Sequence, residues 1–368
     1  MKRFILTLLL IPILFACTPA TAEPSVSAQQ QDDQTILLPM IINEDAEPDK
    51  LEVGVFYYPW YQNPETDGGW WHWDGFGNPA FAPPENVQSD YYPLLGAYSS
   101  FDPAVVDQHF AWIAASGIDV VITSWWGVES PENAAVPLLL DTAVQHDLKV
   151  AFHIEPYTGR TAETLITDVA YLNQTYGSHS AFYRSNKPSR WNSSTANKGV
   201  FFVWLISAPD FESDFVEPSY WRDAIDTIHA STSGGMVIGN ATEPRWLDGG
   251  HFDGLYNYAT VAPADETTFS WSSSLPINSW YIPSVLPGFV GERSNIDISL
   301  PRENGQSYRD QWSAAIETPV KPFMLTITSF NEWHEGTSIE PAANAGPPGT
   351  ENLYKSFGQL GELSLIHI

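Results

Sequence analysis

Residues 119–157, DVVITSWWGVESPENAAVPLLLDTAVQHDLKVAFHIEPY, contain the pattern that decides the fold. Two continuous apolar runs, DVVITSWW (119–126) and KVAFHIEPY (149–157), stand on either side of a helix-like stretch at 134–147. Continuous apolar runs are typical of parallel strands that are covered on both faces. A helix between two such runs therefore predicts a strand–helix–strand unit.

The same alternation extends over residues 51–360. Further strands are predicted at 53–61, 199–206, 235–241, 253–258, 279–288 and 323–333. Helices are expected at 103–116, 161–176, 218–230 and 307–317, and loops replace the helices after the fifth and sixth strands. Eight strands with intervening helices predict a single (β/α)8 barrel. The alternative is an open doubly wound sheet, which is disfavoured because no Gly-rich phosphate loop follows the first strand.

The composition restricts the class of partner. The chain has 368 residues and a formal net charge of -28, from 44 acidic and 16 basic side chains. Such a surface repels phosphate backbones and anionic lipid, so we expect no nucleic-acid partner. Aromatic residues make up 14% of the chain and include 15 tryptophans, which favours neutral sugars whose apolar faces stack on indole. We expect a monomer.

The N-terminal segment has the pattern of a targeting sequence. Residues 1–17, MKRFILTLLLIPILFAC, combine a basic start with a short apolar core, as signal peptides do. LFAC (14–17) resembles a bacterial lipobox, and Cys17 is the only cysteine, so we expect lipidation there. Ala20-Thr21-Ala22 is the competing cleavage site, and residues 18–50 have the composition of a flexible tether. We expect an exported lipoprotein of the cell envelope or cell surface, with secretion as the alternative, that meets the membrane only through its anchor.

The C-terminal end has an unusual sequence. The last six residues, LSLIHI (363–368), match the translation of a transposon-end sequencing adaptor. We expect these residues to be artefactual and the C-terminus to be truncated within a helix that starts near 351.

The residues that end the strands are the candidates for function, because the site of a (β/α)8 barrel lies at the C-terminal ends of its strands. Breaking a glycosidic bond needs a proton donor and a second carboxylate that acts as base or nucleophile. Aromatic walls raise the pKa of a carboxyl group, as an acid catalyst requires. The candidates are Tyr58, Trp60, Trp126, His153, Glu155, Tyr256, Asn331, Glu332, Trp333 and Glu335, with His72 from the loop after the first strand.

Glu332 and Glu335 are the central pair of this set. They face the same side only if the segment turns helically after the eighth strand. In a chain that has few Lys and Arg partners, we favour a catalytic role over a structural ion pair. A metal site is the second possibility, built from His153 and Glu155 with His334 nearby. No further ligand stands at a suitable spacing, so we expect no metal.

Five motifs follow one another over about residues 53–341: FYYPWYQNPETDGGWWHW (56–73), TSWWG (123–127), FHIEPY (152–157), FDGLYNY (252–258) and TSFNEWHEGTSIEP (328–341). They resemble glycoside hydrolase family 99, the endo-α-1,2-mannosidases and mannanases, and the last motif is the most specific. The resemblance implies a retaining, endo-acting enzyme on a (β/α)8 barrel without cofactor, acting on α-mannan or mannose-containing oligosaccharides.

The resemblance also implies roles for single residues. Glu332 is the base and Glu335 the general acid/base, and the base removes the proton of the sugar's own 2-hydroxyl to give a 1,2-anhydro intermediate. An ordinary covalent intermediate on a carboxylate fits the same sequence. Glu155 resembles a substrate contact, and Tyr58, Trp126 and Tyr256 resemble residues that line the sugar subsites. Trp126 favours mannose over glucose in the outer subsite.

Two alternatives remain open. A carbohydrate-binding lipoprotein without turnover needs the aromatic residues but not a matched acid and base. An endo-α-glucanase on a related barrel would use a similar site on another α-glycan.

Overall fold

The computed structural model describes residues 50–194, 196–265, 267–343, 345–350 and 352–355. The predicted signal peptide, Cys17, almost all of the tether and the segment 363–368 lie outside these residues. None of the helices in the described part of the chain combines the length and the apolar character that a membrane span requires.

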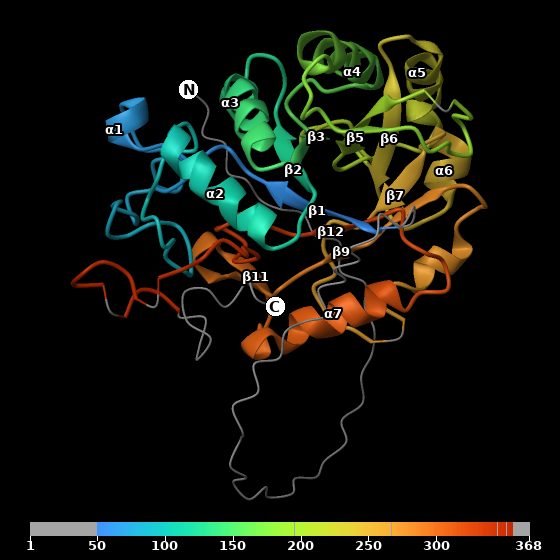
Figure 1. Ribbon diagram of the computed structural model, residues 1–368. Helices are drawn as coiled ribbons and strands as arrows, with labels where there is room; N and C mark the ends of the chain where they lie inside the picture. Colours follow the sequence, from blue (N-terminus) through green and yellow to red (C-terminus); the bar gives the residue numbers. More distant parts are fainter. Residues whose placement is uncertain (1–49, 195, 266, 344, 351, 356–368) are drawn as a thin grey trace, which may run out of the picture. The chain divides into compact units, whose positions relative to one another are not determined.

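Nine parallel strands form one nearly closed barrel (Figure 1). β8 and β9 are separated in the chain only by Pro283, so one segment supplies both ends of the sheet. This arrangement gives eight strand positions and is consistent with the predicted (β/α)8 barrel. In sheet order the strands are β8 (Trp280–Ile282), β7 (Gly254–Tyr256), β6 (Gly235–Asn240), β5 (Lys198–Val203), β3 (Lys149–Ile154), β2 (Val120–Trp125), β1 (Glu52–Tyr57), β12 (Met324–Ile327) and β9 (Ser284–Val285).

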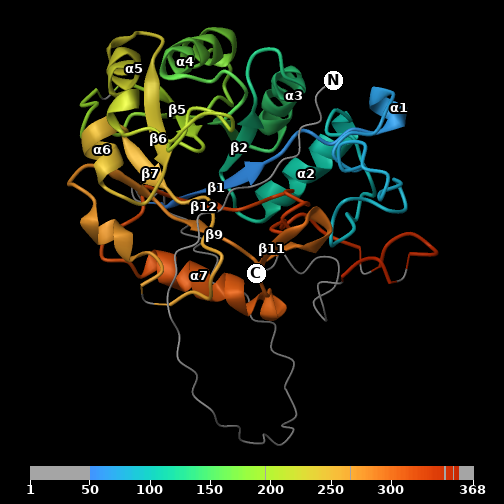
Figure 2. The same ribbon diagram turned by 180° about the vertical axis from the view of Figure 1, so that it is seen from behind.

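Helices follow most of the strands, close to the predicted ranges. Figure 1 and Figure 2 show α3, α4 and α5 beside the strands, with α7 next to β9. The side chains of Asp102, Ser130 and Thr161 cap α2, α3 and α4, which explains why α3 begins before the predicted residue 134. The helices are α2 (Pro103–Ala115), α3 (Pro131–Gln145), α4 (Ala162–Tyr176), α5 (Ser219–Ala230) and α7 (Gln306–Ile316).

Several elements differ from the sequence predictions. A short helix, α6 (Arg245–Gly250), follows β6 where only a loop was expected. The seventh strand, predicted at 279–288, is interrupted at Pro283, because proline has no N–H to donate to a neighbouring strand. The described residues 352–355 form turns instead of the expected helix. The unpredicted short elements are α1 (Pro64–Asp67), β4 (Arg184–Ser185) and the antiparallel hairpin of β10 (Phe289–Gly291) and β11 (Ile296–Leu300).

Aromatic side chains fill the barrel below the C-terminal ends of the strands. Phe56 of β1 lies 4.8 Å from His153 of β3, 6.1 Å from Phe202 of β5 and 5.6 Å from Tyr256 of β7, measured between ring centroids. Contacts with three other strands place Phe56 inside the barrel. This layer forms the floor on which the candidate site stands.

Candidate active site

Glu332 and Glu335 lie in a tight turn that follows β12. Ser329 holds the turn from within, because its hydroxyl oxygen accepts the N–H of Glu332 at 2.8 Å and its own N–H donates to the Thr337 carbonyl at 3.1 Å. Gly336 has a φ of +59°, and a Cβ atom there would lie 2.4 Å from the Val290 carbonyl oxygen. Only glycine fits this position, so the tight turn sets the backbone positions of Glu332 and Glu335.

Asn331 ties this turn to the end of β1. Its side-chain oxygen accepts the Tyr58 N–H at 2.8 Å, and its side-chain nitrogen donates to the Tyr58 carbonyl at 2.9 Å. The Tyr61 hydroxyl donates to the Asn331 carbonyl and accepts the Trp333 N–H, each at 3.1 Å. Asn331 is fully buried and its amide is used within the protein. The structure therefore places it behind the two glutamates, as a link between the first and last strands.

Trp333 also lies behind the turn and is fully buried. Its indole N–H donates to Oε2 of Glu340 at 2.9 Å, and the Tyr98 hydroxyl donates to the same oxygen at 2.7 Å. The other carboxylate oxygen of Glu340 lies 3.2 Å from Nε2 of His109. From the sequence, Trp333 was expected among the sugar contacts, and Glu340, whose carboxylate accepts the hydrogen bond from the Trp333 indole, was not identified.

The two candidate catalytic carboxylates are buried, with 6% of Glu332 and 8% of Glu335 exposed. Burial raises the pKa of Glu332 well above its ordinary value, and the nearby charge of Glu335 raises it further. Burial, with a smaller contribution from Glu155, raises the pKa of Glu335 to about 7. The two groups titrate as a pair. At neutral pH this pair holds a proton that one of its members can donate.

Each carboxylate of the pair has a defined donor. The backbone N–H of His334 donates to Oε1 of Glu332 at 3.0 Å, a contact that stabilises the ionised form of Glu332. The Tyr258 hydroxyl donates to Oε2 of Glu335 at 3.3 Å and lies 2.5 Å from the Tyr58 hydroxyl. Tyr258 was not among the predicted site residues. Its signal was present in FDGLYNY, because it stands two residues after Tyr256 and continues the same side of the strand.

Glu155 supplies a third buried carboxylate at the end of β3. Its Oε1 accepts the Ser124 hydroxyl at 2.8 Å and lies 2.9 Å from Nδ1 of His153. Nε2 of His153 lies 2.6 Å from the Tyr256 hydroxyl, and the Trp126 indole N–H donates to Ser124 at 3.1 Å. Ser124 of β2 and His153 of β3 contact Glu155 directly, and Tyr256 of β7 contacts His153.

The three carboxylates surround one tyrosine. Burial raises the pKa of Tyr58 well above its ordinary value, and the charges of Glu155, Glu332 and Glu335 raise it further. The His153 ring, which contacts Glu155, is stacked at 6.1 Å on the Tyr258 ring, which contacts Glu335, so the predicted carboxylates lie in one place.

Aromatic rings continue the wall beside Tyr58. The Trp60 ring lies 4.5 Å from Tyr58 and is stacked on His72 at 4.4 Å, with an angle of 10° between the planes. Nε2 of His334 donates to the His72 carbonyl at 3.2 Å. Burial lowers the pKa of His334 to about 4, and burial together with His334 lowers the pKa of His72. Both rings are therefore neutral at neutral pH, so this wall offers a sugar polar and apolar contacts without cationic charge.

The structure thus brings nine predicted residues to the C-terminal end of the barrel and places Asn331 and Trp333 behind them. In the described part of the chain, no three His, Cys, Asp or Glu side chains form a group that could hold a metal ion. The nine residues are Tyr58, Trp60, His72, Trp126, His153, Glu155, Tyr256, Glu332 and Glu335.

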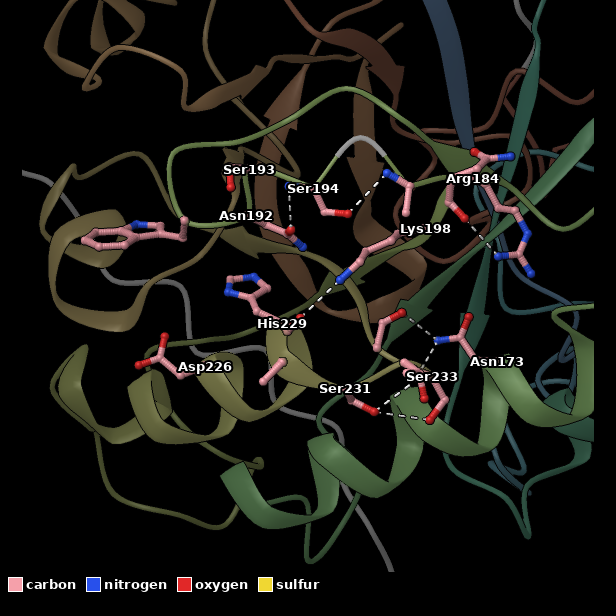
Figure 3. Close-up of a pocket in the computed structure, with 16 residues that line it drawn as sticks. Asn173, Arg184, Asn192, Ser193, Ser194, Lys198, Asp226, His229, Ser231 and Ser233 are labelled. Carbon is pink, nitrogen blue, oxygen red and sulfur yellow. Dashed lines mark hydrogen bonds between the residues drawn. The ribbon is translucent and has the colours of Figure 1, made fainter.

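A cavity of about 1000 Å³ lies elsewhere, at the N-terminal ends of β5 and β6 (Figure 3). Two of its polar side chains are bonded to nearby backbone: Lys198 Nζ donates to the His229 carbonyl at 3.1 Å and Asn173 Nδ2 donates to the Ser233 carbonyl at 3.0 Å. Asp226 is the acidic residue among its described lining and lies 2.7 Å from His251. This cavity has no paired carboxylates, so it does not compete with the site at the other end of the barrel.

Comparison with known proteins agrees with this geometry. Residues 49–359 match the model of Glycosyl hydrolase family 99. The glycoprotein endo-alpha-1,2-mannosidase-like protein of Danio rerio is 35% identical over an alignment of 334 residues that covers 79% of this chain and 71% of that protein. The glycoprotein endo-alpha-1,2-mannosidase of Mus musculus is 31% identical over an alignment of 337 residues that covers 81% of this chain and 70% of that protein.

A solved structure gives the same result at the level of the fold. The GH99 endo-alpha-mannosidase from Bacteroides thetaiotaomicron is 31% identical, with a TM-score of 0.70 over 86% of this chain and 94% of that chain. The resemblance stated from the sequence motifs is confirmed. The chain belongs to glycosyl hydrolase family 99.

Proposed function

We propose that this chain is a retaining, endo-acting α-mannosidase that cleaves internal α-1,2-mannosidic bonds of mannan or mannose-containing glycans. The observation that carries the proposal is the pair Glu332 and Glu335, buried on one turn at the C-terminal end of the barrel, each with a raised pKa. Family membership and the activity named in its relatives support the same reaction.

Glu335 is proposed as the general acid. Its pKa of about 7 leaves a large share of it protonated at neutral pH. It gives this proton to the glycosidic oxygen as the bond from C1 to that oxygen breaks. Glu332 is proposed as the base on the family resemblance; the His334 N–H favours its ionised form and offsets part of the rise in its pKa that burial and Glu335 cause. It takes the proton of the 2-hydroxyl, and the resulting oxygen bonds to C1 to give the 1,2-anhydro sugar.

The second half of the reaction reverses these proton movements. A water molecule gives a proton to Glu335 while its oxygen bonds to C1 and the bond from C1 to O2 breaks. Glu332 returns its proton to O2. Two displacements at C1 leave the released sugar in the α configuration, so the enzyme retains.

The remaining site residues bind and position the sugar in this proposal. Glu155, held by Ser124 and His153, is placed to bind a sugar hydroxyl beside the reacting ring. The walls are formed by Tyr58, Trp60, His72 and Trp126, and the floor includes His153 and Tyr256. Asn331 and Trp333 act as positioning residues, since their side chains bond to the protein behind the turn.

The location of the protein is a separate proposal. The lipobox-like LFAC (14–17) supports an exported lipoprotein that is anchored through Cys17. Wild type should partition into detergent after expression in a bacterium that processes lipoproteins, and Cys17→Ala should be released or left unprocessed. Wild type that stays in the aqueous phase would contradict the anchor.

The test of activity compares wild type, Glu332→Gln and Glu335→Gln on yeast-type α-mannan and on α-1,3-glucan. Products are separated by size, and the first anomer released is identified by NMR. We expect short α-configured oligosaccharides from mannan and a loss of several orders of magnitude in each variant. Wild type that binds mannan without releasing products would indicate a carbohydrate-binding protein. Release from glucan alone would indicate a glucanase.

A further inference from the structure

An exposed aromatic side chain stands next to Trp126 at the edge of the site. Phe211 belongs to the loop that follows β5, and 45% of it is exposed. Its ring lies 6.0 Å from the Trp126 ring, with an angle of 29° between the planes. Trp126 is bonded to Ser124, which donates to Glu155. Phe211 thus extends the aromatic wall outward from a carboxylate of the site.

A buried arginine fixes the loop on the N-terminal side of Phe211. Arg160 is fully buried, and each of its five N–H groups donates to a backbone carbonyl. No carboxylate is needed for this arrangement, because the carbonyls accept every proton that the guanidinium offers. The acceptors are the carbonyls of Ile154 at 3.1 Å, Trp204 at 2.7 Å, Leu205 at 3.0 Å, Ala208 at 3.1 Å and Pro209 at 2.5 Å.

Asp210 fixes the loop directly beside Phe211. Its carboxylate accepts the Gly159 N–H at 2.7 Å, the Glu212 N–H at 3.0 Å and the Ser213 hydroxyl at 2.6 Å. The backbone is therefore held on both sides of the phenylalanine. A large apolar ring in contact with water is unfavourable, and here a rigid loop keeps it exposed and next to a tryptophan of the site.

We propose that Phe211, beside Trp126, forms an outer subsite that binds a neutral hexose unit of the glycan chain. This unit lies one position further from the carboxylates than the unit that contacts Trp126. The apolar face of the hexose packs on the phenyl ring. Because the loop is already ordered, binding there costs little conformational entropy. This subsite rests on the proposed function, since it assumes that the glycan runs from Glu332 and Glu335 past Trp126.

The test measures binding to soluble α-mannan and to α-1,2-mannobiose in the full chain carrying Glu335→Gln, so that the ligand is not cleaved during titration. Phe211→Ala is compared with Phe215→Ala, a matched control. Phe215 is in the same loop and 72% exposed, and it stacks on no other ring of the described residues. We expect Phe211→Ala to weaken mannan binding by about fivefold to tenfold, the loss of one aromatic stacking contact, and to leave mannobiose binding unchanged. Phe215→Ala should leave both unchanged.

The inference is overturned if Phe211→Ala binds mannan as the parent does, if mannobiose binding falls equally, or if Phe215→Ala causes the same loss. It is also overturned if the parent binds no mannan. Turnover of mannan by wild type is measured in parallel. If wild type does not cleave mannan but Phe211→Ala weakens mannan binding, the proposed hydrolase function is wrong and the outer subsite is supported. If wild type cleaves mannan but Phe211→Ala does not change mannan binding, the outer subsite is wrong and the hydrolase function is supported.

Discussion

Replacing Arg160 with lysine tests whether one buried guanidinium holds the loop beside the site. Lysine has three N–H donors on one nitrogen, so at least two of the five hydrogen bonds that Arg160 donates are lost. A hydrogen bond from a charged group contributes about 1.5–3 kcal/mol, which predicts a loss of about 3–6 kcal/mol in the free energy of unfolding. Burial already lowers the pKa of Arg160 to about 10. The same burial would lower the pKa of a lysine further towards neutral pH and weaken its remaining bonds.

The assay is urea unfolding at neutral pH, followed by tryptophan fluorescence, for wild type, Arg160→Lys and Arg245→Lys. Arg245 is the matched control, because its side chain is 54% exposed and its ion pair with Glu217, at 3.0 Å, lies on the surface. We expect Arg245→Lys to change the unfolding free energy by less than about 0.5 kcal/mol. A change below about 1 kcal/mol for Arg160→Lys, with an unchanged dependence on urea, would refute the account of the five carbonyls.

Further predictions concern the carboxylates. Because burial raises the pKa of Glu335 from 4.5 to about 7, the folded protein binds more protons than the unfolded chain between these values, and its stability should fall as the pH rises through this window. Glu335→Gln should remove that part of the slope, measured by urea unfolding at about pH 5 and pH 8. The kcat/KM of wild type should fall as the pH rises through about 7, where the acid loses its proton. Tyr258→Phe removes a donor that lowers the pKa of Glu335, so this alkaline limb should move to higher pH, and an unmoved limb would exclude Glu335 as its origin. Glu340→Leu removes the buried carboxylate that accepts from the Trp333 N–H and the Tyr98 hydroxyl and should cost about 3 kcal/mol or more, whereas Glu340→Gln keeps a carbonyl acceptor and should cost less. Equal losses in the two Glu340 variants would contradict this role.

The barrel strands were predictable because most of them are buried on both faces. All six residues of β2 are buried, and five of the eight residues of the run DVVITSWW are apolar for that reason. The break at Pro283 and the hairpin of β10 and β11 were not predicted. Both depend on which neighbouring strand the segment pairs with, which is a tertiary property. The helix α6 was missed because six residues are too few to show a 3.6-residue period.

The site was predictable where function needs a side chain at a strand end, and less so where another residue supports it. Glu332, Glu335 and Glu155 stand out because carboxylates among aromatics are rare. Trp333 shares the same short motif, yet it is fully buried behind the turn, where its indole N–H donates to Glu340. Glu340 and Arg160 act through contacts with distant segments, and a single sequence contains no local pattern for such contacts.

The hydrogen bonds between Asn331 and Tyr58 join residues 273 positions apart in the chain. Glu332 and Glu335 follow the last strand and reach their places only when it pairs with the first. Contacts between such distant segments form slowly, because the loop between them has to close first. During synthesis, the growing chain would expose β1 as an unpaired edge until β12 emerges. Hydrolytic activity would therefore begin only in a finished barrel, so turnover would report that folding is complete.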